Sequence, residues 1–334
     1  MNDSPAGQQN CPPIEPTPCY ETKYGGAFCA NSLEFMAGLP PQSVNLVLTS
    51  PPFALRKKKS YGNVSADQYI DWFMPFAQQI HRILKRNGSF VLDIGGSWNQ
   101  GQPTRSLYHF ELLLKLCGEK GLFSLAQEFY WYNRAKMPAP AQWVTIERVR
   151  VKDAVQPIWW LSKTPRPYAS NTRVLTPYSK SMRNLLKRGY NAGPRPSGHV
   201  VSVKWGRDQG GAIPTNLIEA SNTSSSDPYL RACRQHGLVV HPARFTEKVP
   251  EFFIRFLTRP GHLVLDPFAG SNMVGAVAER LRRRWVAVEI NRDYVVGSAF
   301  RFDGVGVSFV AGALCRGDVP QGAQAAPAKP ECMC

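Results

Sequence analysis

Short apolar runs alternate with longer stretches of helical pattern along most of the chain. The runs are rich in β-branched and aromatic residues and are bounded by Gly, Pro or Asn, which predicts strands. Asp67–Leu84 and Leu107–Glu119 instead carry apolar residues at helical spacing. This alternation indicates an α/β domain with a parallel or mostly parallel sheet. The predicted strands are Val44–Thr49, Ser89–Ile94, Phe129–Tyr132, Ile158–Leu161, Leu263–Leu265 and Trp285–Val288.

The stretch from Lys163 to about His236 breaks this rhythm. It is polar, basic and rich in Pro, Gly, Ser and Asn, and it is too long for an ordinary loop of a compact domain. We interpret it as an inserted module or a set of functional loops. The predicted organisation is a flexible arm (1–21), a first part of the α/β domain (22–162), the insertion (163–236), a second part of the domain (237–303) and a tail (304–334).

Charge narrows the choice of partner. The 334 residues include 40 Lys and Arg against 24 Asp and Glu, a formal net charge of +16. Such an excess favours a polyanion, nucleic acid before a membrane surface. Charged residues or Pro interrupt each apolar run before it could span a bilayer, and the chain has no convincing basic amphipathic helix or lipidation signal. We therefore expect a nucleic-acid partner and no membrane contact.

The N-terminus and the cysteines favour a cytoplasmic protein. The first residues lack the basic and then apolar pattern of a secretory signal. The eight Cys residues are scattered without paired CxxC clusters, so we expect reduced thiols and no metal site.

One segment has the pattern of a nucleoside site. His262–Asn291 is typical of a strand, a turn, a helix and a second strand. Gly270 allows a tight turn, Ser271 or Asn272 can cap the helix, and Glu289 follows at a spacing that suits hydrogen bonds to both ribose hydroxyls. Neither GxGxxG nor GxxxxGK[ST] occurs, so the pattern favours a nucleoside without phosphates. An ordinary βαβ unit remains the alternative.

The sequence TSPPF, which ends an earlier predicted strand, suits work on an amine. Pro51 and Pro52 have fixed φ angles, and Ser50 is restricted by the proline that follows it. The Ser50 hydroxyl and the Pro51 carbonyl can accept hydrogen bonds from an amino group, while Phe53 offers a face for a planar base. Two acceptors localise the lone pair of a nucleobase amine, which can then attack an electrophilic methyl group in line. A purely structural turn is the alternative.

A base must leave the duplex to reach such a pocket, so DNA contacts are expected nearby. The basic run that begins with Arg56, Lys57 and Lys58 follows the turn directly. It suits phosphate contacts, with a solvated charge cluster as the alternative.

Taken in order, five segments resemble the motifs of the β-group amino-methyltransferases of bacterial restriction–modification systems. The SPPF form resembles the cytosine-N4 branch, and the resemblance extends from about Tyr24 to Phe302. It implies S-adenosylmethionine as methyl donor and a Rossmann-like, seven-stranded, mostly parallel sheet in a circularly permuted motif order, with the catalytic half first. The segments are TSPPF (Thr49–Phe53), NGSFVLDIGG (Asn87–Gly96), FYWYN (Phe129–Asn133), HPARFTEKVPEFFIRFLT (His241–Thr258) and DPFAGSN (Asp266–Asn272).

The resemblance also implies roles for single residues. Asp93 would lie near Ser50 and bind the serine or take a proton from the amine, although a carboxylate that caps a helix is the alternative. Asn31 stands where the family usually has an acid for the adenine amine. Glu289 would bind the ribose. Asp266, Phe268, Gly270 and Ser271 would surround the cofactor, and His241 to Phe245 would close over its methionine end. Tyr130, Trp131 and Tyr132 would wall the base pocket, with core packing as the alternative for at least one of them because side chains alternate along a strand.

The resemblance makes the insertion the target-recognition region. Arg suits guanine and Asn suits adenine in the major groove, but the sequence does not separate base contacts from phosphate contacts. The expected partner is double-stranded DNA with a short, palindromic site. The chain would be paired in function with a restriction endonuclease, and a monomer would suffice. The candidates are Arg173, Arg195, His199, Lys204, Arg207 and Asn216.

Other activities agree less well with these residues. Cytosine-C5 methylation needs a Pro-Cys turn, and this chain has only the reverse order, Cys11-Pro12, in its arm. Adenine-N6 methylation is the nearest alternative, because that branch normally has Asp where this chain has Ser50. A DNA-binding module without catalysis is a second alternative, and RNA methylation is a weaker one.

Overall fold

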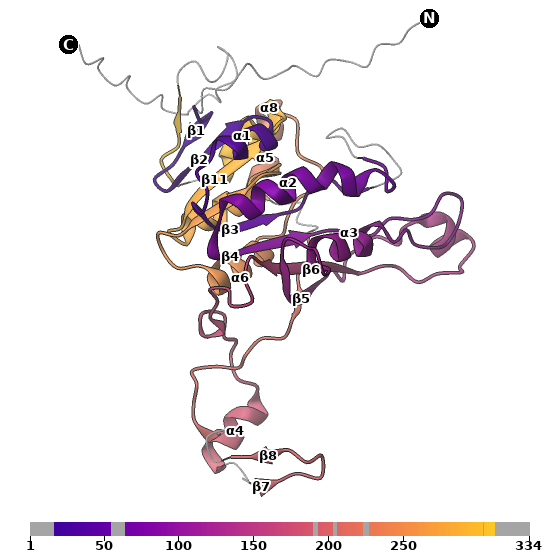
Figure 1. Cartoon of the computed structure of the whole chain (residues 1–334), viewed down its shortest axis with the longest axis vertical. Helices are drawn as coiled ribbons and strands as arrows, with labels where there is room; N and C mark the ends of the chain where they lie inside the picture. The colour runs from indigo at the N-terminus through magenta and orange to yellow at the C-terminus, as the bar shows by residue number, and fades with distance from the viewer. Residues whose placement is uncertain are drawn as a thin grey trace, which may run out of the picture.

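A single ten-stranded sheet with helices on both faces organises the molecule (Figure 1). The computed structural model describes residues 17–54, 64–189, 193–202, 206–222, 227–302 and 304–310. The strand order is β12-β1-β2-β11-β10-β3-β4-β6-β5-β9. The seven strands from β2 to β5 in this order form the predicted seven-stranded sheet, and short strands extend it at both edges.

The strands agree with the predicted runs and lengthen several of them. Their bounds are β1 Tyr20–Glu21, β2 Gly25–Cys29, β3 Val44–Thr49, β4 Leu84–Asp93, β5 Ser124–Tyr132, β6 Val155–Ser162, β7 Gly193–Pro194, β8 Val200–Val201, β9 Leu217–Glu219, β10 Leu263–Asp266, β11 Arg284–Glu289 and β12 Ser308–Phe309.

The helices cover two separate hydrophobic clusters. Helices α1, α2 and α3 pack on one face of the sheet, and α6 and α7 pack on the other. In β3, Leu46 and Leu48 join one cluster while Val44 and Val47 join the other, so this strand is apolar throughout. The helix bounds are α1 Ser32–Gly38, α2 Tyr69–Ile83, α3 Tyr108–Cys117, α4 Lys180–Arg188, α5 Pro228–Gln235, α6 Lys248–Leu257, α7 Met273–Arg280 and α8 Arg292–Ser298.

The sheet is mixed, because β6 runs antiparallel to both of its neighbours, β4 and β5. Residues 133–154 lead from the end of β5 to the start of β6 at the same edge of the sheet, so β6 returns in the opposite direction. The pairs β2–β11, β11–β10, β10–β3, β3–β4 and β5–β9 are parallel, as the sequence predicts.

The predicted boundaries of the arm and the tail are wrong at their inner ends. Strand β1, inside the predicted arm, pairs with β2 and with β12, inside the predicted tail. Tyr20 is fully buried, and its hydroxyl group hydrogen-bonds to Ser298 and Asn272. One buried aromatic residue thus orders a segment whose composition predicts coil. The rest of both predicted segments, 1–16 and 311–334, lies outside the described residues.

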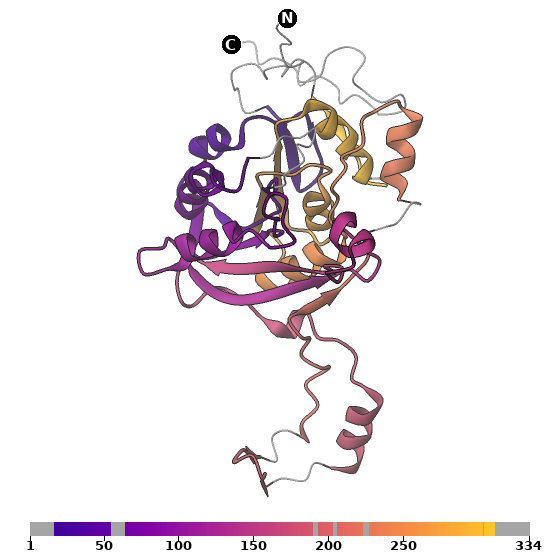
Figure 2. The same ribbon diagram turned by 90° about the vertical axis from the view of Figure 1, so that its right-hand side faces the viewer.

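The predicted insertion divides into parts that join the domain and a part that stands away from it. Strand β9 extends the sheet beside β5, and a pair of backbone hydrogen bonds joins Thr176 to Ala212. Beyond that pair, the segment that contains α4 and the β7–β8 hairpin projects from the molecule in both views (Figures 1 and 2). We call the described residues of this part, 177–189, 193–202 and 206–211, the projecting segment. No described helix is long and apolar enough to cross a membrane.

Candidate active site

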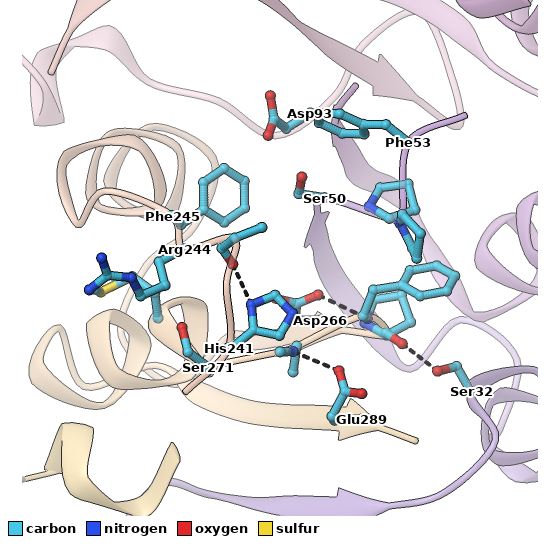
Figure 3. A pocket seen from close by; sticks show the side chains of 18 of the residues that line it. Ser32, Ser50, Phe53, Asp93, His241, Arg244, Phe245, Asp266, Ser271 and Glu289 are labelled. Carbon is cyan, nitrogen blue, oxygen red and sulfur yellow. Dashed lines mark hydrogen bonds between the residues drawn. The ribbon is translucent and has the colours of Figure 1, made fainter. Parts of the chain in front are cut away.

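Every residue predicted for catalysis or for cofactor binding lines one cavity of about 390 Å³ (Figure 3). The cavity lies where β3, β4, β10 and β11 end, so the two halves of the chain meet in it. Its volume is within the range of small-molecule sites. The predicted residues are Ser50, Pro51, Pro52, Phe53 and Asp93 from the catalytic half, Asn31 from the loop after β2, and His241, Phe245, Asp266, Phe268, Gly270, Ser271 and Glu289 from the cofactor half.

Glu289 closes the turn after β10 from the neighbouring strand β11. Its carboxylate accepts hydrogen bonds from the Gly270 N–H at 2.8 Å and from the Asn291 N–H at 2.9 Å. Burial raises the pKa of Glu289, and these backbone hydrogen bonds lower it in part. A carboxylate has about four acceptor sites, so capacity remains for two hydroxyl groups of a ribose. These residues fit a nucleoside cofactor.

His241 faces the turn at Gly270 from the opposite side. Its Nδ1 bonds to the Ala243 carbonyl, so Nδ1 carries the hydrogen. Burial is the main reason that the pKa of His241 falls to about 4; the positive charges of Arg301 and Arg244 lower it further, against the effect of the Ala243 carbonyl. The imidazole ring is therefore neutral at pH 7.

Asp266, at the end of β10, bonds to the catalytic half as well as to its own turn. Its Oδ1 accepts from the Thr49 hydroxyl at 2.6 Å and from the Phe268 N–H at 3.1 Å. Asp266 is 3% exposed, and burial raises its pKa to about 7. The bond to Thr49 fixes the residue before Ser50 relative to the turn at residues 267–272, which we call the cofactor turn.

Ser50 and Asp93 meet at the ends of two adjacent parallel strands. The β3–β4 register pairs Thr49 with Leu92, so the next residue of each strand lies at the same level. Asp93 is 1% exposed and takes hydrogen bonds from the Gln156 amide and from Ser50. Burial raises the pKa of Asp93 to about 6, although both bonds oppose this shift. The contact that strand order predicts is present, and the bonding partners are side chains of the cavity rather than a helix terminus.

Aromatic rings bound the catalytic end. Phe53 packs on the backbone at Gly95, where an added Cβ atom would be 2.6 Å from the ring. Trp131 is 7% exposed, lines the cavity and donates from Nε1 to the Ala220 carbonyl. Tyr130 and Tyr132 are half-buried and are not among the lining residues. Of the three predicted rings Trp131 therefore lines the cavity, and the alternation of side chains along a strand, which left the three rings open to different roles, separates it from Tyr130 and Tyr132.

Asn31 lines the cavity but has a structural partner. It is the N-cap of α1, and its side-chain oxygen accepts from the Leu33 N–H at 2.9 Å. The next residue, Ser32, donates from its hydroxyl group to the Pro267 carbonyl. The first bond caps α1, and the second ties the start of this helix to the turn after β10.

The cavity also includes residues that the sequence did not single out. Gln156 holds Asp93 from the start of β6, and its only sequence signal is its place just before the apolar run Ile158–Leu161. Trp72 and Phe76 come from α2, where aromatic residues at helical spacing indicate core packing. Arg244 also lines the cavity; it belongs to the segment from His241 to Phe245, and no pattern in the sequence indicates a separate role for it.

The predicted DNA-binding residues have different surroundings. Arg195 and His199 are exposed in the turn of the β7–β8 hairpin, at the end of the projecting segment, and Arg207 is exposed in the same segment. Arg56, Lys57, Lys58 and Lys204 lie outside the described residues.

Two further candidates make structural contacts. The Arg173 guanidinium donates to the carbonyls of Arg255 and Phe256 near the end of α6, so it caps that helix. The Asn216 amide nitrogen donates to the Glu128 carbonyl. A side chain that reads adenine needs its nitrogen and its oxygen together. Both residues therefore fit structural roles better than base contacts.

The family can now be established by comparison. A family model described as DNA methylase matches residues 44–299. The chain belongs to this family. The type II methyltransferase M.PvuII of Proteus hauseri is 47% identical over 288 residues, which cover 85% of each chain.

A second curated relative and two solved structures are also similar to this chain. The DNA adenine methyltransferase YhdJ of Escherichia coli (strain K12) is 25% identical over 86% of this chain and 87% of its own. The solved PvuII DNA methyltransferase (cytosine-N4-specific) has a TM-score of 0.70 and 43% identity, and the match covers 85% of this chain and 88% of that one. An M1.HpyAVI–SAM complex, at 16% identity and a TM-score of 0.51, shares the fold. The Rossmann-like α/β class predicted for this DNA methylase is confirmed.

The part of this DNA methylase that the structure describes contains no group of three or more His, Cys, Asp or Glu side chains that could hold a metal ion. The three acids of the cavity have separate partners instead. Asp93 bonds to Gln156, Asp266 to Thr49, and Glu289 to the Gly270 backbone.

Proposed function

We propose that this DNA methylase transfers the methyl group of S-adenosylmethionine to the N4 amine of a flipped-out cytosine in a short, palindromic site of duplex DNA. The observation that carries the proposal is the meeting of the Ser50–Asp93 pair and the Glu289–Gly270 turn in one cavity. The similarity to the cytosine-N4-specific PvuII enzyme supports the choice of base.

The cofactor half fits the methyl donor along its length. Glu289 has acceptor sites left for the ribose hydroxyls, and Gly270 leaves room at the turn. Asp266, Phe268 and Ser271 line the same end of the cavity, and the segment from His241 to Phe245 covers it. When bound, the cofactor supplies an electrophilic methyl group on a sulfonium.

The catalytic half prepares the amine. The Ser50 hydroxyl and the Pro51 carbonyl accept its hydrogen bonds and localise the nitrogen lone pair. Asp93 accepts from Ser50, which orients the hydroxyl group. With its pKa near 6, the Asp93 carboxylate is largely ionised at pH 7 and can take the surplus proton, directly or through Ser50. Phe53 and Trp131 give the extruded base apolar walls.

DNA binding relies on charge outside the cavity. The formal net charge of +16 suits a polyanion. Arg56, Lys57 and Lys58 directly follow the TSPPF segment, which we call the catalytic turn. They would contact phosphates beside the extruded base. Arg195, His199 and Lys204 would bring the projecting segment onto the duplex. Asn216 would support β9 rather than read a base, because its amide nitrogen is bonded to Glu128.

The biological setting follows from the same activity. The chain would protect DNA from a cognate restriction endonuclease without a stable complex between the two proteins. It would act as a monomer in the bacterial cytoplasm, since each strand of a palindrome can be methylated in turn.

Analysis of the methylated nucleoside tests the proposal. The full chain is incubated with methyl-labelled S-adenosylmethionine and plasmid DNA of mixed sequence, and the DNA is digested to nucleosides. Label in N4-methyldeoxycytidine is the expected result. Label in N6-methyldeoxyadenosine would overturn the assignment of the base, and an absence of label would favour a binding module without catalysis.

A further inference from the structure

One face of α2 contacts both the catalytic turn and the cofactor turn. Tyr69, Trp72 and Phe76 are spaced by three and four residues, so they lie on the same side of the helix. Tyr69 is completely buried, and its hydroxyl group donates a 2.9 Å hydrogen bond to the Pro52 carbonyl. Helix α2, which lies outside the five motif segments, therefore holds the carbonyl group of Pro52, the second proline of TSPPF.

The other two residues of this face reach the cofactor half. The ring centroids of Trp72 and Phe268 are 5.9 Å apart, and those of Phe76 and Phe268 are 5.0 Å apart. Trp72 and Phe76 also line the cavity, together with Phe268 itself. Because Tyr69 and Phe76 are two helical turns apart on α2, this helix spans the distance between the two turns.

Tyr69 is itself held in place. Its ring meets the Tyr108 ring edge to face at 4.9 Å, and the Tyr108 hydroxyl group donates to the Gly95 carbonyl. Gly95 is the residue on which Phe53 packs. The tyrosine pair therefore supports the catalytic turn at Pro52 and beneath Phe53.

The bond to the Pro52 carbonyl matters because prolines leave the turn little other freedom. The φ angles of Pro51 and Pro52 are fixed by their rings, so the orientation of the Pro52 carbonyl is the main remaining variable at that residue. When Tyr69 fixes this carbonyl, the peptide plane that carries the Pro51 carbonyl is also restrained. An in-line transfer is sensitive to such placement, since a shift of about 1 Å in a reacting group can cost about 100-fold in rate.

We propose that Tyr69 is a positioning residue for methyl transfer, and that with Trp72 and Phe76 it sets the catalytic turn of TSPPF at a fixed separation from the cofactor turn at Phe268. This inference rests on the proposed function. Tyr69 does not line the cavity; it acts through the Pro52 carbonyl. Its loss should change the rate of transfer and leave the binding of S-adenosylmethionine almost unchanged.

Tyr69→Phe tests this role with the loss of one oxygen atom, because the ring and its contacts remain. The matched control is Ser89→Ala, which removes another buried hydroxyl group, the 2.9 Å acceptor of the Trp160 indole N–H, within β4. Each change leaves one buried partner without its bond, so both should lower stability to a similar degree. For both variants and the wild type, the measurements are the thermal midpoint, the Kd of S-adenosylmethionine, and kcat and KM on plasmid DNA.

The expected result is a fall of about tenfold in kcat for Tyr69→Phe, with the Kd of S-adenosylmethionine and the KM for DNA within about twofold of wild type. Ser89→Ala should keep the wild-type kcat. Equal kcat values for the two variants, or a loss of cofactor affinity that accounts for the slower rate, would overturn the role of Tyr69. A wild-type chain that methylates no DNA would overturn the proposed function and this inference together, whereas an active wild type separates the two questions.

Discussion

Gly270 lies so close to His241 that a Cβ atom on Gly270 would be 3.0 Å from the imidazole ring. Its φ angle of +51° is also in the left-handed region, where side chains are disfavoured. The same residue donates its N–H to Glu289. Three requirements meet at Gly270: a left-handed backbone conformation, a close imidazole ring and a hydrogen bond to Glu289, the acid proposed to bind the ribose.

Gly270→Ala should therefore weaken cofactor binding and the fold together. We expect a loss of ~1–2 kcal/mol in the free energy of unfolding from the backbone conformation alone. The Kd of S-adenosylmethionine should rise, because the His241 ring must move away from the turn. Gly38→Ala is the control, since no atom lies within 4 Å of the added Cβ and the residue belongs to α1. Calorimetric titration and denaturant unfolding check both; a Gly270→Ala variant with wild-type Kd would contradict this account of the turn.

Ser50→Ala should separate binding from turnover. The hydroxyl group bonds to Asp93 at the proposed site of the amine, whereas the turn proposed to bind the cofactor is formed by other residues. We expect kcat to fall by about 100-fold, comparable with the loss of one group that stabilises a transition state. The Kd of S-adenosylmethionine should stay near that of wild type. A parallel loss of cofactor affinity and turnover would instead mean that Ser50 has a structural role.

Methyl transfer should speed up as the pH rises through about 6, the pKa to which burial raises Asp93. Below that pH the carboxyl group is protonated and cannot take a proton from the amine. Asp93→Asn should be slow at every pH and should lack the rise. The measurement is kcat against pH at saturating cofactor and DNA, and a variant that keeps the wild-type profile would exclude Asp93 as the titrating group.

The same pKa has the opposite effect on stability. A folded-state pKa of about 6, against an ordinary value of 3.8, means that the folded chain binds more protons than the unfolded chain between these values. The free energy of unfolding should therefore decrease as the pH rises through this window. Asp93→Asn should remove this share of the pH dependence in urea titrations, and Asp266, whose pKa is raised to about 7, should retain its own share. Variant and wild-type curves that stay parallel would contradict the raised pKa of Asp93.

Arg301 should matter for the cofactor turn although no motif contains it. Its side chain is 4% exposed, donates to the Ser271 carbonyl at 2.6 Å and to the Ser271 hydroxyl oxygen at 3.1 Å, and pairs with Asp227, which also pairs with Arg244. Arg301→Met leaves these acceptors with fewer donors, so we expect a loss of ~1–3 kcal/mol in the free energy of unfolding. It should also raise the Kd of S-adenosylmethionine.

The control for Arg301→Met is Arg255→Gln, which breaks an exposed pair with Glu251 on α6. It should change stability by less than about 1 kcal/mol. Denaturant unfolding and equilibrium binding distinguish the two variants. Equal effects would mean that the buried contacts of Arg301 contribute no more than a surface pair.

The sequence predicts the catalytic edge of the sheet well, because that edge depends on local signals. Ser50 and Glu289 each follow or end an apolar run, and the carboxyl ends of parallel strands lie together. Asp93 could be placed beside Ser50 because the two strands are consecutive in the chain. Gly270 was identified because a turn there needs a residue without a Cβ atom.

The residues that were missed depend on contacts between distant parts of the chain. Tyr20 orders β1 through partners more than 250 positions away, so composition indicated only a flexible arm. Tyr69 has the pattern of a core helix, and Gln156 has that of a strand. Their polar groups form hydrogen bonds to Pro52 and Asp93 only once the fold brings these residues together. Arg173 has the charge of a DNA contact, and only the fold reveals that it caps α6.

The most direct test of the central claim is a structure of the full chain with S-adenosylhomocysteine and a duplex that contains its target. The account predicts an extruded cytosine whose N4 lies within about 3 Å of both the Ser50 hydroxyl oxygen and the Pro51 carbonyl oxygen. It also predicts that the nitrogen faces the cofactor sulfur. A cytosine bound elsewhere in the cavity, with its amine out of reach of these two oxygens, would contradict it.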